Sequence, residues 1–125
     1  MRHVLSWFEI PVDDIDRAQH FYETLLGQPL RREEMGPRQS RAVFPYDEGS
    51  VGGALRSSPH PPSPSSEGMV AYLNAGPSLG VVLSRADELG AEVLLEMVKL
   101  PRDIGWIAHI RDCEGNRVGL HSLNA

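Results

Sequence analysis

The stretch from Trp7 to Gly27 constrains the fold most, because its pattern predicts a strand, a capped turn and one amphipathic helix in direct succession. Apolar side chains alternate with the others over residues 7–12, which is the period of a half-buried strand. Asp13 and Asp14 are suited to cap a helix, since a short carboxylate can accept the free amide hydrogens of the first turn. Gly27 follows the last apolar residue, where a left-handed backbone meets no Cβ clash. The apolar stripe of the helix consists of Ile15, Ala18, Tyr22, Leu25 and Leu26.

The same pattern returns in the second half of the chain. Residues 69–74 alternate like a strand, Pro77 suits a first helical turn, and Gly90 follows a second apolar stripe as Gly27 follows the first. Short strands separated by turn residues are predicted after each helix. The chain is therefore expected to contain two copies of a strand-helix-strand-strand-strand unit. Three pairs of positions match at one constant offset: Ala42 with Ala108, Glu48-Gly49 with Glu114-Gly115, and Gly53 with Gly119.

A proline-rich linker separates the two units. Residues 57–68 read SSPHPPSPSSEG, a composition that cannot form a packed element. Repeat one is thus expected over residues 1–57, the linker over 58–68 and repeat two over 69–125, within one domain of residues 1–125. The expected fold is α+β, with two tandem βαβββ modules forming curved mixed sheets around a concave cavity.

Composition and charge exclude several classes of function. Twelve Lys and Arg against 17 Asp and Glu give a formal charge of −5, which argues against binding to nucleic acid through its phosphates. No run of apolar residues is long enough to span a membrane, and a cytoplasmic protein is the simplest expectation. Cys113 is the single cysteine, so no internal disulfide can form.

Three segments carry a resemblance to a known family: FEIPVDDIDRAQHFYETLLG at the start, VGGAL in the middle and IAHIRDCEGNRVGLHS at the end. The chain resembles the vicinal oxygen chelate superfamily, which includes glyoxalase I, bleomycin-resistance proteins and extradiol dioxygenases. The resemblance extends over essentially the whole chain. It implies the glyoxalase/bleomycin resistance/dihydroxybiphenyl dioxygenase fold and, as is common among similar chains, a homodimer. It does not imply one reaction, because a fold hosts many functions.

The resemblance also implies four positions for a divalent metal, two in each repeat. Carried over to this sequence, they are Trp7, Gly53, Met69 and Gly119. None of these is a usual ligand for such an ion, which needs imidazole or carboxylate donors. We therefore expect that the family's metal site is absent, that no cofactor is bound, and that glyoxalase I chemistry by the usual route does not occur.

Strand alternation assigns the faces of the predicted sheets. Phe8, Ile10 and their counterparts are expected under the helices, and Tyr72 is expected in the core on the same face as Val70. Their neighbours are expected to face the cavity: Trp7, Glu9, His109, Arg111, Gly119 and His121.

Three hypotheses use the acid and the two histidines of this face. In the first, Glu9, His109 and His121 fix a small organic molecule in a mostly apolar pocket. Its lining would be Trp7, Glu9, Gly53, Leu55, Met69, His109, Gly119 and His121. In the second, the same three residues form a displaced site for a divalent metal such as iron or zinc.

In the third hypothesis His121 or His109 is a general base and Glu9 orients it or acts as an acid, in a metal-independent isomerase, epimerase or lyase. The three residues could also be solvent-facing side chains without a function. The leading expectation is a glyoxalase/bleomycin-resistance-like binder. The alternative is a lyase, isomerase or dioxygenase-like enzyme that uses Glu9 with His109 or His121, either as acid and base or as a displaced metal site. Whether the cavity closes within one chain or between two chains stays open, because both arrangements use the same repeats.

Overall fold

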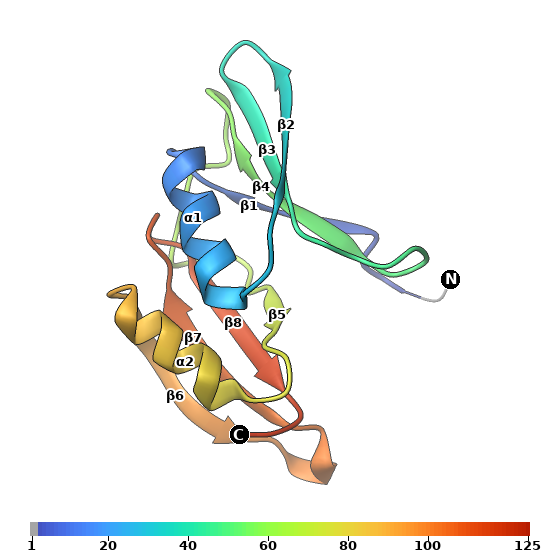
Figure 1. Ribbon diagram of the computed structural model, residues 1–125, viewed down its shortest axis with the longest axis vertical. Helices are drawn as coiled ribbons and strands as arrows, with labels where there is room; N and C mark the ends of the chain where they lie inside the picture. The colour runs from blue at the N-terminus through green and yellow to red at the C-terminus, as the bar shows by residue number, and fades with distance from the viewer. Residues whose placement is uncertain (1–2) are drawn as a thin grey trace.

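The computed structural model describes residues 3–125 and contains two four-stranded sheets, each with one α-helix (Figure 1). The first sheet has the order β1 (Trp7–Pro11), β4 (Gly52–Ser57), β3 (Gln39–Val43) and β2 (Arg31–Gly36). The second has the order β5 (Tyr72–Asn74), β8 (Arg117–Ser122), β7 (Trp106–Arg111) and β6 (Glu92–Lys99). Helix α1 (Ile15–Leu26) follows β1, and α2 (Leu79–Glu88) follows β5. This arrangement confirms the predicted α+β fold of two βαβββ repeats.

Within each repeat the first strand pairs parallel with the last, and the other pairs are antiparallel. Helix α1 begins where predicted, because the Asp14 side chain accepts the amide hydrogen of Arg17. It ends at Gly27, whose φ of 67° is left-handed. Helix α2 begins later than Pro77 suggested, because Ser78 is its cap and accepts from the amide of Val81.

The segment between the repeats is longer than the sequence suggested. The strand predicted over residues 69–74 is reduced to β5, and residues 58–71 form no helix or strand. Part of the segment is fixed to the second repeat, because the Ser65 amide donates to Asn116 Oδ1 at 2.9 Å and the Arg117 amide to the Ser65 carbonyl at 3.3 Å.

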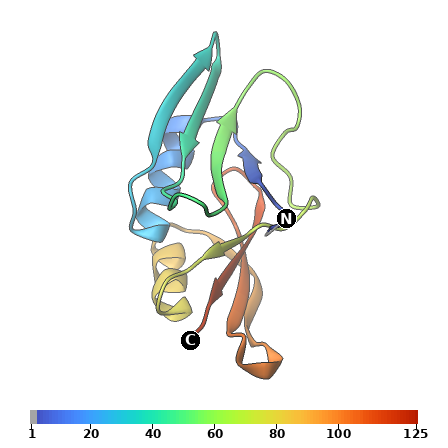
Figure 2. The same cartoon turned by 90° about the vertical axis from the view of Figure 1, so that its right-hand side faces the viewer.

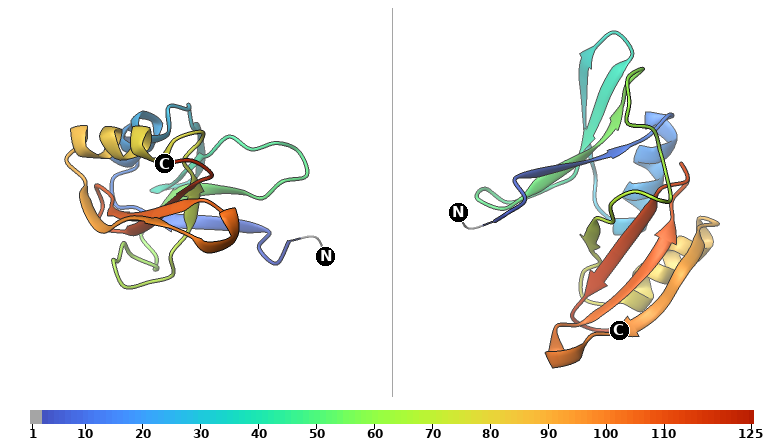
Figure 3. Two further views of the ribbon diagram at one scale, coloured as in Figure 1. Left: turned by 90° about the horizontal axis from the view of Figure 1, so that it is seen from below. Right: turned by 180° about the vertical axis from the view of Figure 1, so that it is seen from behind.

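Both helices lie on the same side of the molecule, and the two sheets lie side by side beneath them (Figures 2 and 3). The helices and the sheet faces beneath them share one apolar core, as the alternation of the strands predicted. Neither α-helix of residues 3–125 is long and apolar enough to cross a membrane. The largest fully buried apolar side chains are Tyr22, Leu25, Leu55, Leu79, Ile110, Val118 and Leu120.

A buried polar junction ties the two repeats together at the turn of residues 112–116. Asp112 Oδ2 accepts the Tyr22 hydroxyl of α1 at 2.6 Å, and Asn116 Nδ2 donates to the Pro11 carbonyl at 2.7 Å. The side chain of Glu114 is fully buried and accepts the amide of Asp13 at 2.5 Å. Turn residues of repeat two therefore cap and orient the helix of repeat one, which fixes the angle between the sheets.

The faces of the two sheets that point away from the helices are called the concave faces below. Neither helix covers them, and within this chain they do not close over one another (Figure 3). Their side chains come from every second strand residue, as the pleat requires. The candidate functional residues are on these faces.

Candidate functional site

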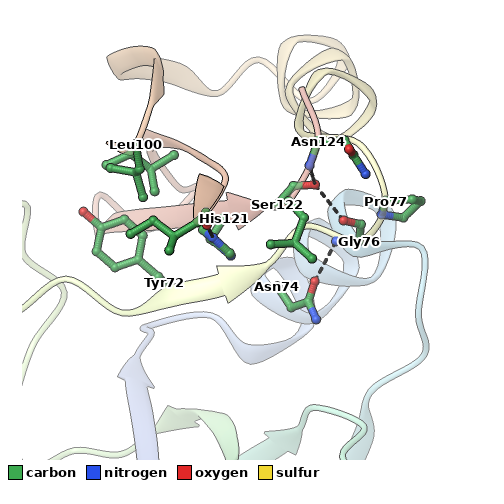
Figure 4. A pocket seen from close by; sticks show the side chains of 11 residues that line it. Tyr72, Asn74, Gly76, Pro77, Leu100, His121, Ser122 and Asn124 are labelled. Atoms are coloured by element: carbon green, nitrogen blue, oxygen red, sulfur yellow. Dashed lines mark hydrogen bonds between the residues drawn. The ribbon is translucent and has the colours of Figure 1, made fainter. Parts of the chain in front are cut away.

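A cavity of about 1000 Å³ opens on the concave face of the second sheet, at the end where β6 connects to β7 (Figure 4). Its floor is formed by β5, β7 and β8, and its wall by the connection at residues 100–105. The lining is mainly apolar. It consists of Tyr72, Asn74, Gly76, Pro77, Leu100, Ile104, Ile107, His121, Ser122, Leu123 and Asn124.

The wall is a tightly wound connection that includes one turn of 3-10 helix, η1 (Pro101–Asp103). Arg102 and Asp103 have left-handed φ angles of 60° and 56°, and Gly105 has a φ of 107°. A Cβ at Gly105 would lie 2.3 Å from the backbone oxygen of Ser122, so only glycine allows this close approach. The connection is closed by a hydrogen bond of 2.8 Å from the Leu100 amide to the Gly105 carbonyl.

His121 holds this wall in place. Its Nε2 lies 2.6 Å from the carbonyl oxygen of Ile104. A carbonyl can only accept, so Nε2 carries the proton and Nδ1 keeps its lone pair in the neutral ring. In residues 3–125 no hydrogen bond is formed by Nδ1, which makes it the one ring nitrogen of His121 that can contact a ligand.

Two polar side chains of the lining, those of Asn74 and Ser122, are bonded to the backbone of Gly76. Ser122 Oγ donates to the Gly76 carbonyl at 2.7 Å, and Asn74 Oδ1 accepts the Gly76 amide at 2.8 Å (Figure 4). These bonds fix the turn between β5 and α2 against β8.

At the rim, Tyr72 contacts His109. The Tyr72 hydroxyl lies 2.6 Å from His109 Nε2, and Arg117 Nη1 lies 3.0 Å from His109 Nδ1. The pKa of His109 is lowered from its ordinary value of 6.5, mainly by burial and also by the positive charge of Arg117. The expectation that Tyr72 belongs to the core is wrong, since 48% of it is exposed. Leu73 takes the core position instead, so the phase assigned to this short strand was shifted by one residue.

On the concave face of the first sheet, Glu9 is surrounded by cations. Its carboxylate lies 3.3 Å from Arg41 Nη1 and 3.7 Å from Arg56 Nε, and it accepts the Trp7 indole N–H at 3.2 Å. The Arg41 guanidinium lies 5.8 Å from the centre of the Trp7 ring. The Glu9 carboxylate is thus held by residues of its own sheet.

The predicted lining of the pocket is wrong at two positions of β4. Leu55 is 0% exposed and packs beneath the helices opposite Ile10. Gly53 is on that same face, and a Cβ there would lie 2.1 Å from the ring of Phe8. The constant offset fails because Ala42 lies opposite Leu55 whereas Ala108 lies opposite Leu120, so the β3–β4 connection is one residue longer than the β7–β8 connection. A slip of one residue moves a side chain to the other face of a sheet.

The other predicted site residues are not gathered in one place. Met69 lies outside β5 and is 95% exposed. Trp7 and Glu9 are on the first sheet, His109 and Gly119 lie beside Tyr72, and only His121 lines the cavity. Within the described part of the chain, no three His, Cys, Asp or Glu side chains converge as metal ligands would. The residues present therefore do not fit a divalent ion, either at the family's positions or at Glu9, His109 and His121.

Comparisons with known proteins agree with this architecture. Residues 5–36 match the family model described as bleomycin resistance protein-like N-terminal. The structure of UcmS2 is 28% identical in sequence and superposes with a TM-score of 0.68, over 97% of this chain and 98% of that one. A search of curated proteins gives no match.

Two further structures come from Streptomyces sp. CB03234. One, a glyoxalase/bleomycin resistance protein, is 24% identical, with a TM-score of 0.68 over 94% of this chain and 99% of that one. The other is TnmS3, an antibiotic binding protein, which is 22% identical with a TM-score of 0.67, over 98% of this chain and 96% of that one. At these identities the two likenesses bear on the fold.

Proposed function

We propose that the chain is a member of the vicinal oxygen chelate superfamily and that it binds a small organic molecule in the cavity of its second sheet. The observation that carries this proposal is the cavity of about 1000 Å³. Its volume is at the upper end of the range for small-molecule sites, which are mostly apolar with a few placed polar groups. Leu100, Ile104, Ile107 and Leu123 supply the apolar wall, and Tyr72 and His121 supply polar atoms. An antibiotic is one suitable ligand class, since TnmS3 shares the fold and binds one.

Binding accounts for the cavity better than proton transfer does. A general base needs a free lone pair close to a second group that orients it. Glu9 forms ion pairs with Arg41 and Arg56 on the first sheet, away from the cavity. Both ring nitrogens of His109 already have hydrogen-bond partners. His121 remains, since the Ile104 carbonyl orients its ring through Nε2–H and its Nδ1 forms no hydrogen bond in the described residues. The lyase, isomerase or dioxygenase-like alternative therefore has one candidate group in this chain.

We also propose that the binding form is a homodimer. Both concave faces carry apolar or aromatic side chains that the chain itself leaves uncovered, among them Tyr46, Tyr72 and Ile104. A second copy would cover these faces and close the cavity, which would add area to the contact with a ligand. Sedimentation equilibrium should give twice the mass of the chain, whereas a monomer over the whole concentration range would contradict this part of the proposal.

The proposed binding needs no metal, because the site contains no suitable set of donors. Protein purified without chelator should contain far less than one equivalent of any divalent metal, also after growth with added iron, zinc, nickel or manganese. Its melting temperature should not change on addition of a chelator. About one ion per chain, lost in His121→Ala, would instead favour the displaced site of Glu9, His109 and His121.

The binding proposal is tested by screening apolar and aromatic compounds for a rise in melting temperature, followed by calorimetry. Ile104→Glu places a carboxylate in the apolar wall and should abolish binding of any compound found. Val81→Glu is the matched control, because Val81 is 50% exposed and Ile104 47%, while Val81 is on the solvent side of α2. Equal loss in both variants, or binding that survives Ile104→Glu, would contradict the assignment of this cavity.

A further inference from the structure

Tyr72 reaches from β5 over β8 to β7, and a glycine makes this possible. Its partner in β8 is Gly119, which in turn lies opposite His109 of β7. A Cβ at position 119 would lie 2.5 Å from the Tyr72 ring. The ring can therefore lie flat across β8 and bring its hydroxyl to His109. Figure 4 shows the ring at the side of the cavity, with the hydroxyl on the edge that points away from His121.

The proton positions in this contact follow from Arg117. A guanidinium is always charged and has donors only, so at 3.0 Å from His109 Nδ1 it donates and Nδ1 must accept. The neutral ring then carries its proton on Nε2. Nε2 lies 2.6 Å from the Tyr72 oxygen, which consequently accepts. Burial and the charge of Arg117 both lower the pKa of His109, which keeps the ring in this neutral state near neutrality.

The Tyr72 hydroxyl is left with a proton to donate. Its oxygen accepts from His109, and the structure shows no acceptor for its hydrogen among residues 3–125. The residue is almost half exposed at the rim of the cavity, so a ligand that extends over this rim can reach that hydrogen. Hydrogen bonds in a chain polarise one another, and a cation at the far end strengthens donation to an anionic acceptor.

We propose that the Tyr72 hydroxyl, set by Arg117 and His109, is the donor that makes the cavity prefer ligands with a negatively charged oxygen beside an apolar body, such as a phenolate. This inference rests on the proposed binding function and names the chemical class of its ligand. Tyr72 touches the ligand in this scheme. His109 and Arg117 are positioning residues that act through it.

The probes are para-nitrophenol, at a pH where it is ionised, and para-nitroanisole, which has the same apolar body and no charge. The wild-type protein should bind the phenolate more tightly and should lower the pH at which the bound phenol ionises, seen in its absorption. Tyr72→Phe should weaken phenolate binding about tenfold or more, as for a lost hydrogen bond to a charged group, and leave para-nitroanisole unchanged. Because Tyr72 is exposed, the variant should fold, which its circular dichroism can verify.

The positioning role is tested with Arg117→Met, matched by Arg111→Met. The two arginines lie opposite each other on neighbouring strands, and Arg111 pairs with Glu92, so both variants remove one charge from the same face. Nitrogen chemical shifts of His109 should show the Nε2–H form in the wild type and in Arg111→Met, and a mixture of forms in Arg117→Met. The preference for the phenolate should fall only in Arg117→Met.

The possible results distinguish the donor role of Tyr72 from the proposed binding function on which it rests. Equal binding of both probes to the wild type would refute the donor role and leave the binding site standing. A His109 that carries its proton on Nδ1, or that is charged near neutrality, would also refute it. If the wild type bound neither probe, the proposed function and the ligand class would both be overturned.

Discussion

The hydroxyl of Tyr22 should be one of the most important single polar groups for the stability of this protein. It donates to Asp112 Oδ2 at 2.6 Å, and both residues are buried where α1 of repeat one meets a turn of repeat two. Tyr22→Phe removes the hydroxyl and keeps the ring, which packs edge-to-face against Phe21 and Phe44. The change therefore isolates one hydrogen bond across the inter-repeat junction.

The expected loss follows from the remaining partners of the carboxylate. A hydrogen bond to a charged group contributes about 1.5–3 kcal/mol, and an unsatisfied buried acceptor costs more than a solvated one. In the variant Asp112 Oδ2 still accepts from the side-chain amide of Asn116 at 3.2 Å. Oδ1 still accepts from the backbone amides of Glu114 at 2.9 Å and Asn116 at 2.8 Å. We expect a loss of about 2 kcal/mol, because the carboxylate remains partly satisfied. For a chain of this length that is a fall in melting temperature of about 8 °C.

Denaturant unfolding and calorimetry at one protein concentration measure this loss. Tyr46→Phe is the matched control, since Tyr46 is 49% exposed and its hydroxyl can pair with water. The control should change the free energy of unfolding by less than about 0.5 kcal/mol. A Tyr22→Phe variant as stable as the control would show that the junction does not hold the repeats together.

The effect of Tyr22→Phe on the free energy of unfolding should also depend on pH. Burial, and then the charge of Asp112, raise the pKa of Tyr22 well above its usual value of 10.0, so the folded protein keeps a proton that the unfolded chain loses above that value. Stability from Tyr22 is therefore fully present below pH 10 and declines above it, by up to about 1.4 kcal/mol per pH unit. The difference between wild type and Tyr22→Phe should shrink in this range. A difference that stays constant well above pH 10 would contradict the assigned shift.

Three further predictions concern the site and its surroundings. Gly105→Ala should lower the free energy of unfolding by at least about 2 kcal/mol, because the new Cβ meets backbone at a positive φ. Gly119→Ala should lower it by about 1 kcal/mol, because only the Tyr72 side chain has to move. Equal melting temperatures of the two variants would refute this prediction. Burial, and then the nearby carboxylates, raise the pKa of Cys113 to about 11, so the folded protein should react with a thiol reagent on the order of a hundredfold more slowly than a free cysteine near neutrality. His121→Ala should fold and lose about 1 kcal/mol with its bond to Ile104, and should weaken ligand binding only modestly. An aggregated His121→Ala variant would show that this residue is structural, and loss of a measurable turnover would favour the enzyme hypothesis.

Much of the fold could be predicted because its signals are local. The cap at Asp14, the left-handed Gly27 and the apolar stripe between them depend on neighbours within a few residues. The site could be predicted less well, because the face of the sheet on which each strand residue lies depends on how the strands pair. Leu55 and Tyr72 were each assigned to the wrong face, in one case through a longer connection and in the other through a strand of three residues. The alternation of side chains along a strand does not show which residue of the neighbouring strand is its partner, so the sequence gives no sign of such a slip.

The two βαβββ repeats could be predicted from residue order and side-chain chemistry alone, because each helix cap, turn and apolar stripe is encoded by residues close together in the chain. Which polar groups meet became evident from the three-dimensional packing. The contact of Tyr72 with His109 requires a glycine on the strand between them, and the junction of Tyr22 with Asp112 joins residues from opposite halves of the chain. Such contacts depend on how sheets and helices pack in three dimensions, and no periodicity along the chain encodes them.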